Sequence, residues 1–304
     1  MLKTVAGVAG LLLLTGASWA HRHGQSEAAA RVSACPVEQV ALRTADGNLL
    51  DGVFYRPSVS PRAAAILLVH GFGGNFYNEY FPAFARAAAS QGYATLALNM
   101  RDHDTGPKVS DFTDNETDIA AGLAYLRKAG YSKLVLLGQS MGVNRVLYYE
   151  AATSDPDIVA TVLIAGPGNL FEWNAWQFGR QKAQASVDEA LALKTAGQEQ
   201  QLMVMDLGPL GKALYTARYL LSLRGPNSRS DPYQNLQKVT NRILILQGTA
   251  DKLVEPGVAR RLQQAATTSS KAELVSIEGA GHSFKDNEAE LARHVLEWLK
   301  QVAP

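Results

Sequence analysis

The sequence predicts an α/β fold, in which a doubly wound, mostly parallel sheet carries helices on both faces. Short apolar runs, such as AILLV at 65–69 and ATLAL at 94–98, are typical of strands buried on both faces. Helical patterns separate these runs, and strands that alternate with helices form parallel sheets. Only the segment 168–231 breaks this alternation, and we expect it to form an insertion.

The first segment of the chain, residues 1–20, has the features of a secretory signal peptide. Lys3 gives a positive start, an apolar stretch follows, and SWA at 18–20 offers small residues where a signal peptidase cuts. The apolar stretch is shorter than the ~20 residues of a membrane-spanning helix. We therefore expect cleavage after Ala20, a periplasmic or secreted mature chain, and no stable membrane anchor.

The remainder of the chain is close to neutral. Residues 21–36 form a polar leader, and about 270 residues remain, enough for one large domain with an insertion. The whole chain has 29 Lys and Arg residues against 28 Asp and Glu residues, and residues 1–20 contain only Lys3 among them, so the remainder is balanced. No basic run stands out, which argues against a nucleic-acid partner. The single cysteine, Cys35, excludes an internal disulfide.

Two strands flanking the turn ADGN at 45–48 open the core, and buried strands then alternate with helices. The predicted strands are 37–43, 49–56, 65–69, 94–98, 134–137, 158–165, 242–246 and 273–277. The predicted helices are 84–91, 115–128, 142–152, 256–266 and 287–302. The core therefore comprises residues 37–167 and 232–304.

The insertion 168–231 contains no strand-like run and is expected to be a helical cap over one edge of the sheet. Its aromatic and methionine residues are Phe171, Trp173, Trp176, Phe178, Met203, Met205, Tyr215 and Tyr219. Most of them should pack the cap's own core. Trp173, Trp176 and Phe178 are candidates for a pocket that accepts an apolar or aromatic substrate group.

Ser140 lies in GQSMG at 138–142, between a buried strand and a helix. Ligands of doubly wound sheets bind beyond the carboxyl ends of the strands, where this serine lies. A serine between glycines can be a plain turn residue. The strand–turn–helix context instead favours a nucleophile held on a sharp turn.

A serine nucleophile needs a base, and the base needs an acid. His282 lies in a glycine-rich loop after the last predicted strand, and Asp251 follows the strand RILIL. Asp251 could instead cap the next helix, but Glu255 is better placed for that role. The order Ser140, Asp251, His282 is the one expected for this type of sheet.

The segment VHGFGGN at 69–75 follows another buried strand and can present backbone amides to a developing negative charge. The amides of Phe72 and Met141 are the expected donors of this oxyanion hole. We interpret His70 as a residue that shapes the loop.

The expected catalytic residues and amide donors lie in four motifs: HGFGG at 70–74, GQSMG at 138–142, GTAD at 248–251 and GAGH at 279–282. In these motifs the chain resembles the capped, esterase- or lipase-like serine hydrolases of the α/β-hydrolase superfamily. The resemblance extends from about residue 37 to the C-terminus, except for the cap. It implies Ser140 as nucleophile, His282 as base and Asp251 as acid.

The segment NMRDHDTG at 99–106 departs from the Asp-x-Arg-Gly-His-Gly pattern of many relatives, because Asn99 replaces the first acid and Asp102 the glycine. We interpret Asp102, His103 and Asp104 as loop-shaping residues.

The expected reaction is transfer of an acyl group from a small-molecule ester to water, with neither metal nor cofactor. A peptidase, thioesterase, carbon–carbon hydrolase or perhydrolase could use the same residues. A non-catalytic relative that binds a ligand in the pocket is the alternative from another class.

Overall fold

The computed structural model describes residues 35–77 and 80–304. The predicted signal peptide and the leader before Cys35 lie outside the described residues. Within the described residues, no helix has both the length and the apolar character needed to span a membrane.

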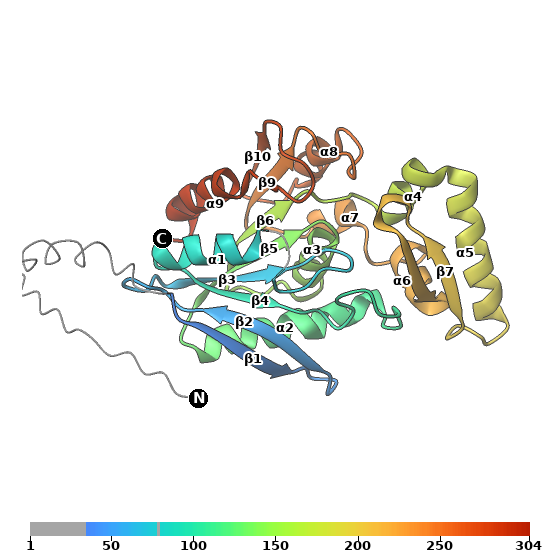
Figure 1. Cartoon of the computed structure of the whole chain (residues 1–304), viewed down its shortest axis with the longest axis horizontal. Coiled ribbons are helices and arrows are strands. Elements are labelled where there is room, and N and C mark those ends of the chain that lie inside the picture. The colour runs from blue at the N-terminus through green and yellow to red at the C-terminus, as the bar shows by residue number, and fades with distance from the viewer. Residues whose placement is uncertain (1–34, 78–79) are drawn as a thin grey trace, which may run out of the picture. The chain divides into compact units, whose positions relative to one another are not determined.

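The core is an eight-stranded sheet in the order β1-β2-β4-β3-β5-β6-β9-β10 (Figure 1). Its strands are β1 (Val37–Arg43), β2 (Leu49–Tyr55), β3 (Ala64–Val69), β4 (Ala94–Leu98), β5 (Lys133–Gln139), β6 (Ile158–Ile164), β9 (Arg242–Gly248) and β10 (Lys271–Ile277). β2 runs antiparallel to β1 and β4, and all other neighbours are parallel. Each of these strands was predicted, β1 and β2 as strands flanking the turn at 45–48 and the others mainly from apolar runs, and the mostly parallel sheet is confirmed.

Helices cover both faces of the sheet. They are α1 (Phe81–Ser90), α2 (Asn115–Lys128), α3 (Met141–Thr153), α7 (Pro232–Leu236), α8 (Val258–Ala265) and α9 (Glu288–Val302). α1 and α9 pack on one face, and α2, α3, α7 and α8 on the other. Along β3, Leu67 faces the second group of helices, whereas Ile66 and Leu68 face α1 and α9. This alternation explains why the buried strands are apolar at every position.

The helix predicted from residue 84 begins earlier, at Phe81. Pro82 lies in its first turn, where the missing amide hydrogen costs no helical hydrogen bond and the fixed φ suits the helix. The helical pattern alone did not place this start.

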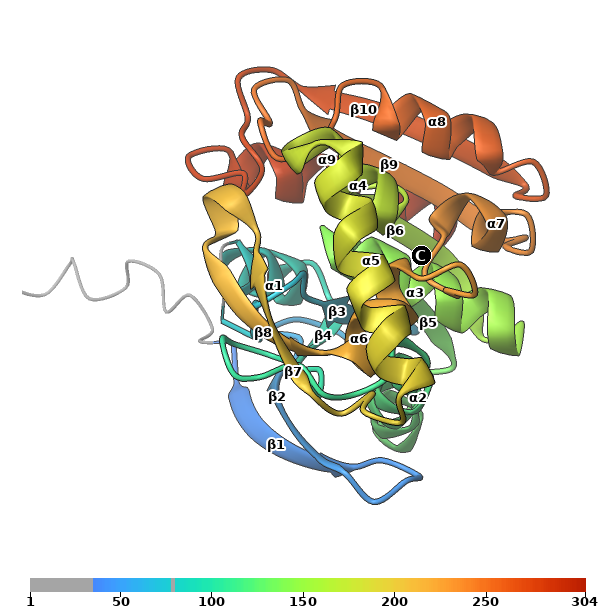
Figure 2. The ribbon, with the colours of Figure 1, turned by 90° about the vertical axis from the view of Figure 1, so that its right-hand side faces the viewer.

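The insertion contains α4 (Leu170–Phe178), α5 (Arg180–Thr195), α6 (Ala217–Arg224) and a hairpin of β7 (Leu202–Asp206) and β8 (Lys212–Thr216). A short 3-10 helix, η2 (Gly208–Leu210), joins the two strands, and another, η1 (Phe112–Asp114), precedes α2. Figure 2 shows the hairpin beside α5.

The helices of the insertion were predicted, but the expectation that it contains no strand is wrong. In β7, Met203 and Met205 are buried, whereas Val204 between them is 68% exposed. This is the alternation of a half-buried strand. The strand is short and lies between two strongly helical segments, so the helical pattern dominated the interpretation of 168–231.

Candidate active site

Ser140 lies on a sharp turn between β5 and α3. Its φ of 53° and ψ of −124° are unusual for a residue with a side chain. The turn requires glycine on both sides of it. A Cβ on Gly138 would lie 2.4 Å from the oxygen of Gly142, and one on Gly142 would lie 2.2 Å from the oxygen of Val69. The two glycines of GQSMG therefore permit the close packing that holds Ser140 in this conformation.

A continuous chain of hydrogen bonds joins Ser140, His282 and Asp251. The Nε2 atom of His282 lies 3.0 Å from Oγ of Ser140, and its Nδ1 atom lies 2.9 Å from Oδ2 of Asp251. The three residues follow β5, β10 and β9, which end at the same edge of the sheet. The structure thus brings together the three side chains selected from the sequence.

Asp251 is surrounded by hydrogen-bond donors. Its Oδ2 also accepts from Nε2 of Gln247 at 2.9 Å, and its Oδ1 accepts from the amides of Leu253 at 2.8 Å and Val254 at 3.1 Å. Burial alone would raise the pKa of Asp251, but the hydrogen bond and charge of His282 outweigh burial and lower the pKa. Asp251 is therefore held as a carboxylate. It does not cap α8, whose N-cap is Gly257.

His70 fixes the loop that follows β3. Its Nδ1–H donates to the oxygen of Gly71 at 2.7 Å, and its Nε2 accepts from the amide of Met100 at 3.0 Å. Burial, with a contribution from the charge of Arg145, lowers the pKa of His70 to about 3, so the ring is neutral. The interpretation of His70 as a loop-shaping residue is confirmed. Asn99 adds a further bond to this loop, because its Oδ1 accepts from the amide of Phe76 at 2.8 Å.

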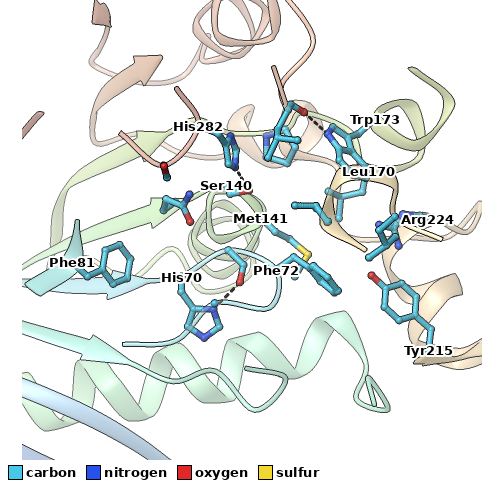
Figure 3. Close-up of a pocket in the computed structure, with 18 residues that line it drawn as sticks. His70, Phe72, Phe81, Ser140, Met141, Leu170, Trp173, Tyr215, Arg224 and His282 are labelled. Carbon is cyan, nitrogen blue, oxygen red and sulfur yellow. Dashed lines mark hydrogen bonds between the residues drawn. The ribbon is translucent and has the colours of Figure 1, made fainter. Parts of the chain in front are cut away.

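The amides of Phe72 and Met141 have no acceptor among the described residues. Met141 is the first residue of α3, where an amide hydrogen has no partner within the helix. Both residues line the cavity that also contains Ser140 (Figure 3). Their free amides are thus available for a negatively charged oxygen beside the serine.

The cavity has a volume of about 270 Å³, and the cap forms one of its walls. The cap residues that line it are Leu170, Trp173, Leu207, Leu210, Tyr215 and Arg224. The indole Nε1–H of Trp173 donates to the oxygen of Leu253 at 2.7 Å, which joins α4 to the loop carrying Asp251.

Of the three pocket candidates, only Trp173 lines the cavity. Trp176 is 41% exposed, and Phe178 packs edge-on against Trp173 at 5.9 Å between ring centroids. The composition of α4 indicated aromatic residues, but the rotation of the helix decides which of them faces the cavity.

Two pocket residues were missed in the sequence. Tyr215 is one of the eight aromatic and methionine residues of the insertion, most of which we expected to pack its core, and Arg224 is not among the predicted site residues. A signal for Arg224 is present, because it follows Leu220 by one helical turn and adjoins Leu223, both buried. A charge on the buried face of an amphipathic helix indicates a functional position.

The loop after β4 is structural, as expected. Both carboxylate oxygens of Asp102 accept from Nη2 of Arg145, at 2.8 and 2.9 Å, and Oδ2 also accepts from the hydroxyl of Tyr219 at 2.8 Å. Asp104 accepts from Nδ2 of Asn75 at 2.8 Å and pairs with His103 at 2.7 Å. These contacts connect the loop to α3, to the cap and to the loop after β3.

A known protein family resembles this chain in sequence, and solved structures resemble it in fold. The family model described as "Alpha/beta hydrolase family" matches residues 66–293. No curated protein sequence matches the chain.

Several solved structures share the fold. Est1E from Butyrivibrio proteoclasticus is 18% identical with a TM-score of 0.63, over 88% of this chain and 99% of that one. The esterase domain of a Rhodothermus marinus protein is 21% identical with a TM-score of 0.61, over 88% and 100%. The Pyrococcus furiosus esterase Pf2001 is 17% identical with a TM-score of 0.64, over 89% and 92%. Since the family match covers most of the sheet and all four motifs, this chain belongs to the alpha/beta hydrolase family.

Proposed function

We propose that this hydrolase cleaves a carboxylic ester through a covalent acyl-enzyme on Ser140. The observation that carries this proposal is the hydrogen-bond chain from Ser140 through His282 to Asp251, with distances of 3.0 and 2.9 Å, at the wall of a cavity. A serine hydroxyl becomes an effective nucleophile when a histidine oriented by a carboxylate takes its proton.

The reaction proceeds in two halves. Oγ of Ser140 attacks the ester carbonyl carbon while Nε2 of His282 takes the hydroxyl proton, and the amides of Phe72 and Met141 donate to the oxyanion. His282 then gives the proton to the leaving alcohol, which departs. In the second half, His282 takes a proton from water, the hydroxide attacks the acyl carbon, and the acid leaves as His282 returns the proton to Ser140.

Carboxylic esters suit this site better than the other substrates of the same chemistry. The cap restricts the cavity to about 270 Å³, which suits a small molecule better than a folded polypeptide. Two of the similar structures are described as esterases. A peptidase, a thioesterase, a carbon–carbon hydrolase or a perhydrolase would require the same triad, so substrate panels must separate them.

We also propose that the mature enzyme works outside the cytoplasm, on the basis of the signal-like segment 1–20. Expression of the full chain in a Gram-negative host, followed by intact mass analysis of the periplasmic fraction, should show a protein beginning at His21. Accumulation of the uncleaved chain in the cytoplasm would contradict export.

Ester hydrolysis is tested with 4-nitrophenyl esters of increasing acyl length, together with matched thioesters and anilides. Ser140→Ala should lower kcat for the best ester by about 10⁴-fold or more, because the nucleophile is lost. Ser186→Ala, at a partly exposed position of α5 that does not line the cavity, is the matched control and should keep the wild-type rate. Comparable rates for wild type and Ser140→Ala would refute the proposed nucleophile.

A further inference from the structure

Two arginines are buried among the described residues, and their surroundings differ. Arg145 is fully buried, and its guanidinium forms an ion pair with Asp102 at 2.8 Å. Arg224 is 7% exposed, and its Nε and Nη1 atoms, like those of Arg145, have no hydrogen-bond partner; the two arginines differ in their counter-charge. No carboxylate of the described residues forms an ion pair with Arg224. A buried charge without a counter-charge destabilises a fold, so it indicates a site that a ligand completes.

Arg224 lines the cavity that is also lined by Ser140 and His282. It is the last residue of α6, and Tyr215 on β8 lies beside it, with 5.6 Å between the guanidinium carbon and the centre of the ring. The hydroxyl of Tyr215 is also buried without a partner that meets hydrogen-bond geometry. In Figure 3 this hydroxyl points toward Arg224, on the opposite side of the cavity from Ser140 and His282.

The space between the two polar groups is apolar. Phe72, Met141 and Leu170 lie between the triad and the pair of Arg224 and Tyr215 (Figure 3). No Asp or Glu is among the residues that line the cavity. The cavity therefore offers a nucleophile at one end, an apolar middle and an uncompensated positive charge at the other end.

We propose that Arg224 and Tyr215 form a carboxylate-binding subsite, so that the substrate is an ester carrying a free carboxylate beyond an apolar spacer. This inference rests on the proposed function and narrows its substrate class to compounds such as half-esters of dicarboxylic acids. The planar guanidinium presents several N–H donors that can hold both oxygens of a carboxylate, and the Tyr215 hydroxyl can donate a further bond.

The competing explanation is that Arg224 only packs. Its guanidinium lies near the face of Tyr215, and a cation at the last turn of a helix interacts favourably with the helix dipole. In that case, replacing Arg224 would change the rates of charged and neutral esters by the same factor.

Kinetics on paired substrates separate the two explanations. One series comprises the mono-4-nitrophenyl esters of succinic to suberic acid, and the other comprises ω-acetoxy acids of the same lengths, so that the carboxylate lies on either side of the ester. Each compound is compared with its methyl ester, which has the same spacer but carries no charge. The measured quantity is the kcat/KM of the acid divided by the kcat/KM of its methyl ester.

In the wild type, at least one acid should be preferred by about 10- to 100-fold, as expected for charge-assisted hydrogen bonds. Arg224→Met should reduce this ratio to one or below, Arg224→Lys should retain part of it, and Tyr215→Phe should reduce it several-fold. The matched control is Arg229→Met, an exposed arginine of the same segment that does not line the cavity, and it should keep the wild-type ratio. A ratio near one for every wild-type pair, or a preference that survives in Arg224→Met, would overturn the subsite.

A binding measurement tests, independently of turnover, whether Arg224 recognises the carboxylate. With the Ser140→Ala variant, calorimetric titration should show that the preferred acid binds at least tenfold more tightly than its methyl ester. The double variant Ser140→Ala, Arg224→Met should lose this difference. If the acid binds as predicted but the wild type hydrolyses neither compound, the subsite stands and the proposed esterase activity fails. If esters are hydrolysed but neither series binds in an Arg224-dependent way, the subsite fails alone.

Discussion

The strained backbone of Ser140 is possible because the residues packed around it are glycines. A serine with φ near 53° stores strain of about 1–3 kcal/mol, which the surrounding fold must outweigh. Gly71 approaches so closely that a Cβ on it would lie 2.8 Å from the Cβ of Ser140. The glycines therefore contribute by leaving room for the close packing of the turn, and this packing holds Ser140 in its reactive position.

The three reactive residues could be predicted because each lies in a short segment directly after an apolar run, in the order Ser140, Asp251, His282. The pair of Tyr215 and Arg224 could not be found in the same way. Arg224 differs from Arg145 because it lacks an acidic partner. The sequence does not show which arginine has such a partner, because paired residues such as Arg145 and Asp102 lie 43 positions apart and meet only in the fold.

Asp251→Asn should lower kcat for ester hydrolysis by about 10³- to 10⁴-fold. Every neighbour of the Asp251 carboxylate is a donor, so an asparagine directs its NH₂ group at a donor. If that group faces His282, the imidazole must carry its proton on Nε2 and cannot accept the proton of Ser140. Steady-state kinetics check this expectation.

The control for that variant is Asp188→Asn on the exposed side of α5, which should retain wild-type activity. Full activity of Asp251→Asn would remove Asp251 from the mechanism.

Glu150 should make the stability of the fold depend on pH. Burial raises its pKa to about 7, although hydrogen bonds from Thr161 and Asn241 oppose the shift. Between its ordinary pKa of 4.5 and about 7, the folded chain binds a proton that the unfolded chain releases. The contribution of Glu150 to the free energy of unfolding is therefore fully present below pH 4.5 and is lost as the pH rises through 7.

Glu150→Gln mimics the protonated form and should reduce the loss of melting temperature between pH 5 and pH 8. Thermal unfolding of both proteins at these two pH values measures the difference. Glu172→Gln, exposed on α4, should leave the wild-type loss unchanged. An equal loss in wild type and Glu150→Gln would show that Glu150 is not the cause.

The elements of the cap attach to the same loops that form the active site. β8 pairs with the loop after β4, since the amide of Lys108 donates to the oxygen of Leu214 at 2.8 Å and the amide of Thr216 donates to the oxygen of Lys108 at 2.9 Å. α4 attaches to the loop of Asp251 through Trp173. The position of the cap is therefore linked to the loops that carry the catalytic and oxyanion groups.

Elements of the core were predictable because burial on both faces of β3, β4, β5, β6 and β9 gives continuous apolar runs bounded by glycine or polar residues. The hairpin of the cap was not, because half-buried strands of 5 residues, such as β7, retain little pattern. The attachment of β8 to Lys108 also depends on residues more than 100 positions apart.

Tyr219→Phe should lower the free energy of unfolding by about 1–3 kcal/mol, because it removes a donor from the buried carboxylate of Asp102. Burial raises the pKa of Tyr219 well above its ordinary value, so its hydroxyl keeps the proton that it donates. Denaturant unfolding measures the change.

Tyr125→Phe is the matched control, since the Tyr125 ring packs against Phe54 and its hydroxyl has no hydrogen-bond partner among the described residues. It should cost less than the Tyr219 variant. Equal effects of the two variants would mean that the bond to Asp102 does not hold α6.

In the molecule as a whole, the order of the strands in the sheet places the four motifs next to one another, where they form one site. β3 and β5 are neighbours, and β6, β9 and β10 follow in order, so the loops carrying Phe72, Ser140, Asp251 and His282 open at the same edge. The fold class followed from alternating strands and helices, whereas the strand order that brings the motifs together could not be obtained from the local pattern. The cap then closes this edge and adds Arg224.

Reaction of the mature protein with a fluorophosphonate probe, followed by intact mass analysis, tests directly whether the serine at position 140 is activated. We expect a single adduct on the wild type and none on Ser140→Ala, with Ser186→Ala labelled as fully as the wild type. Absence of an adduct on the folded wild type, or an adduct that persists in Ser140→Ala, would contradict an activated serine at this position.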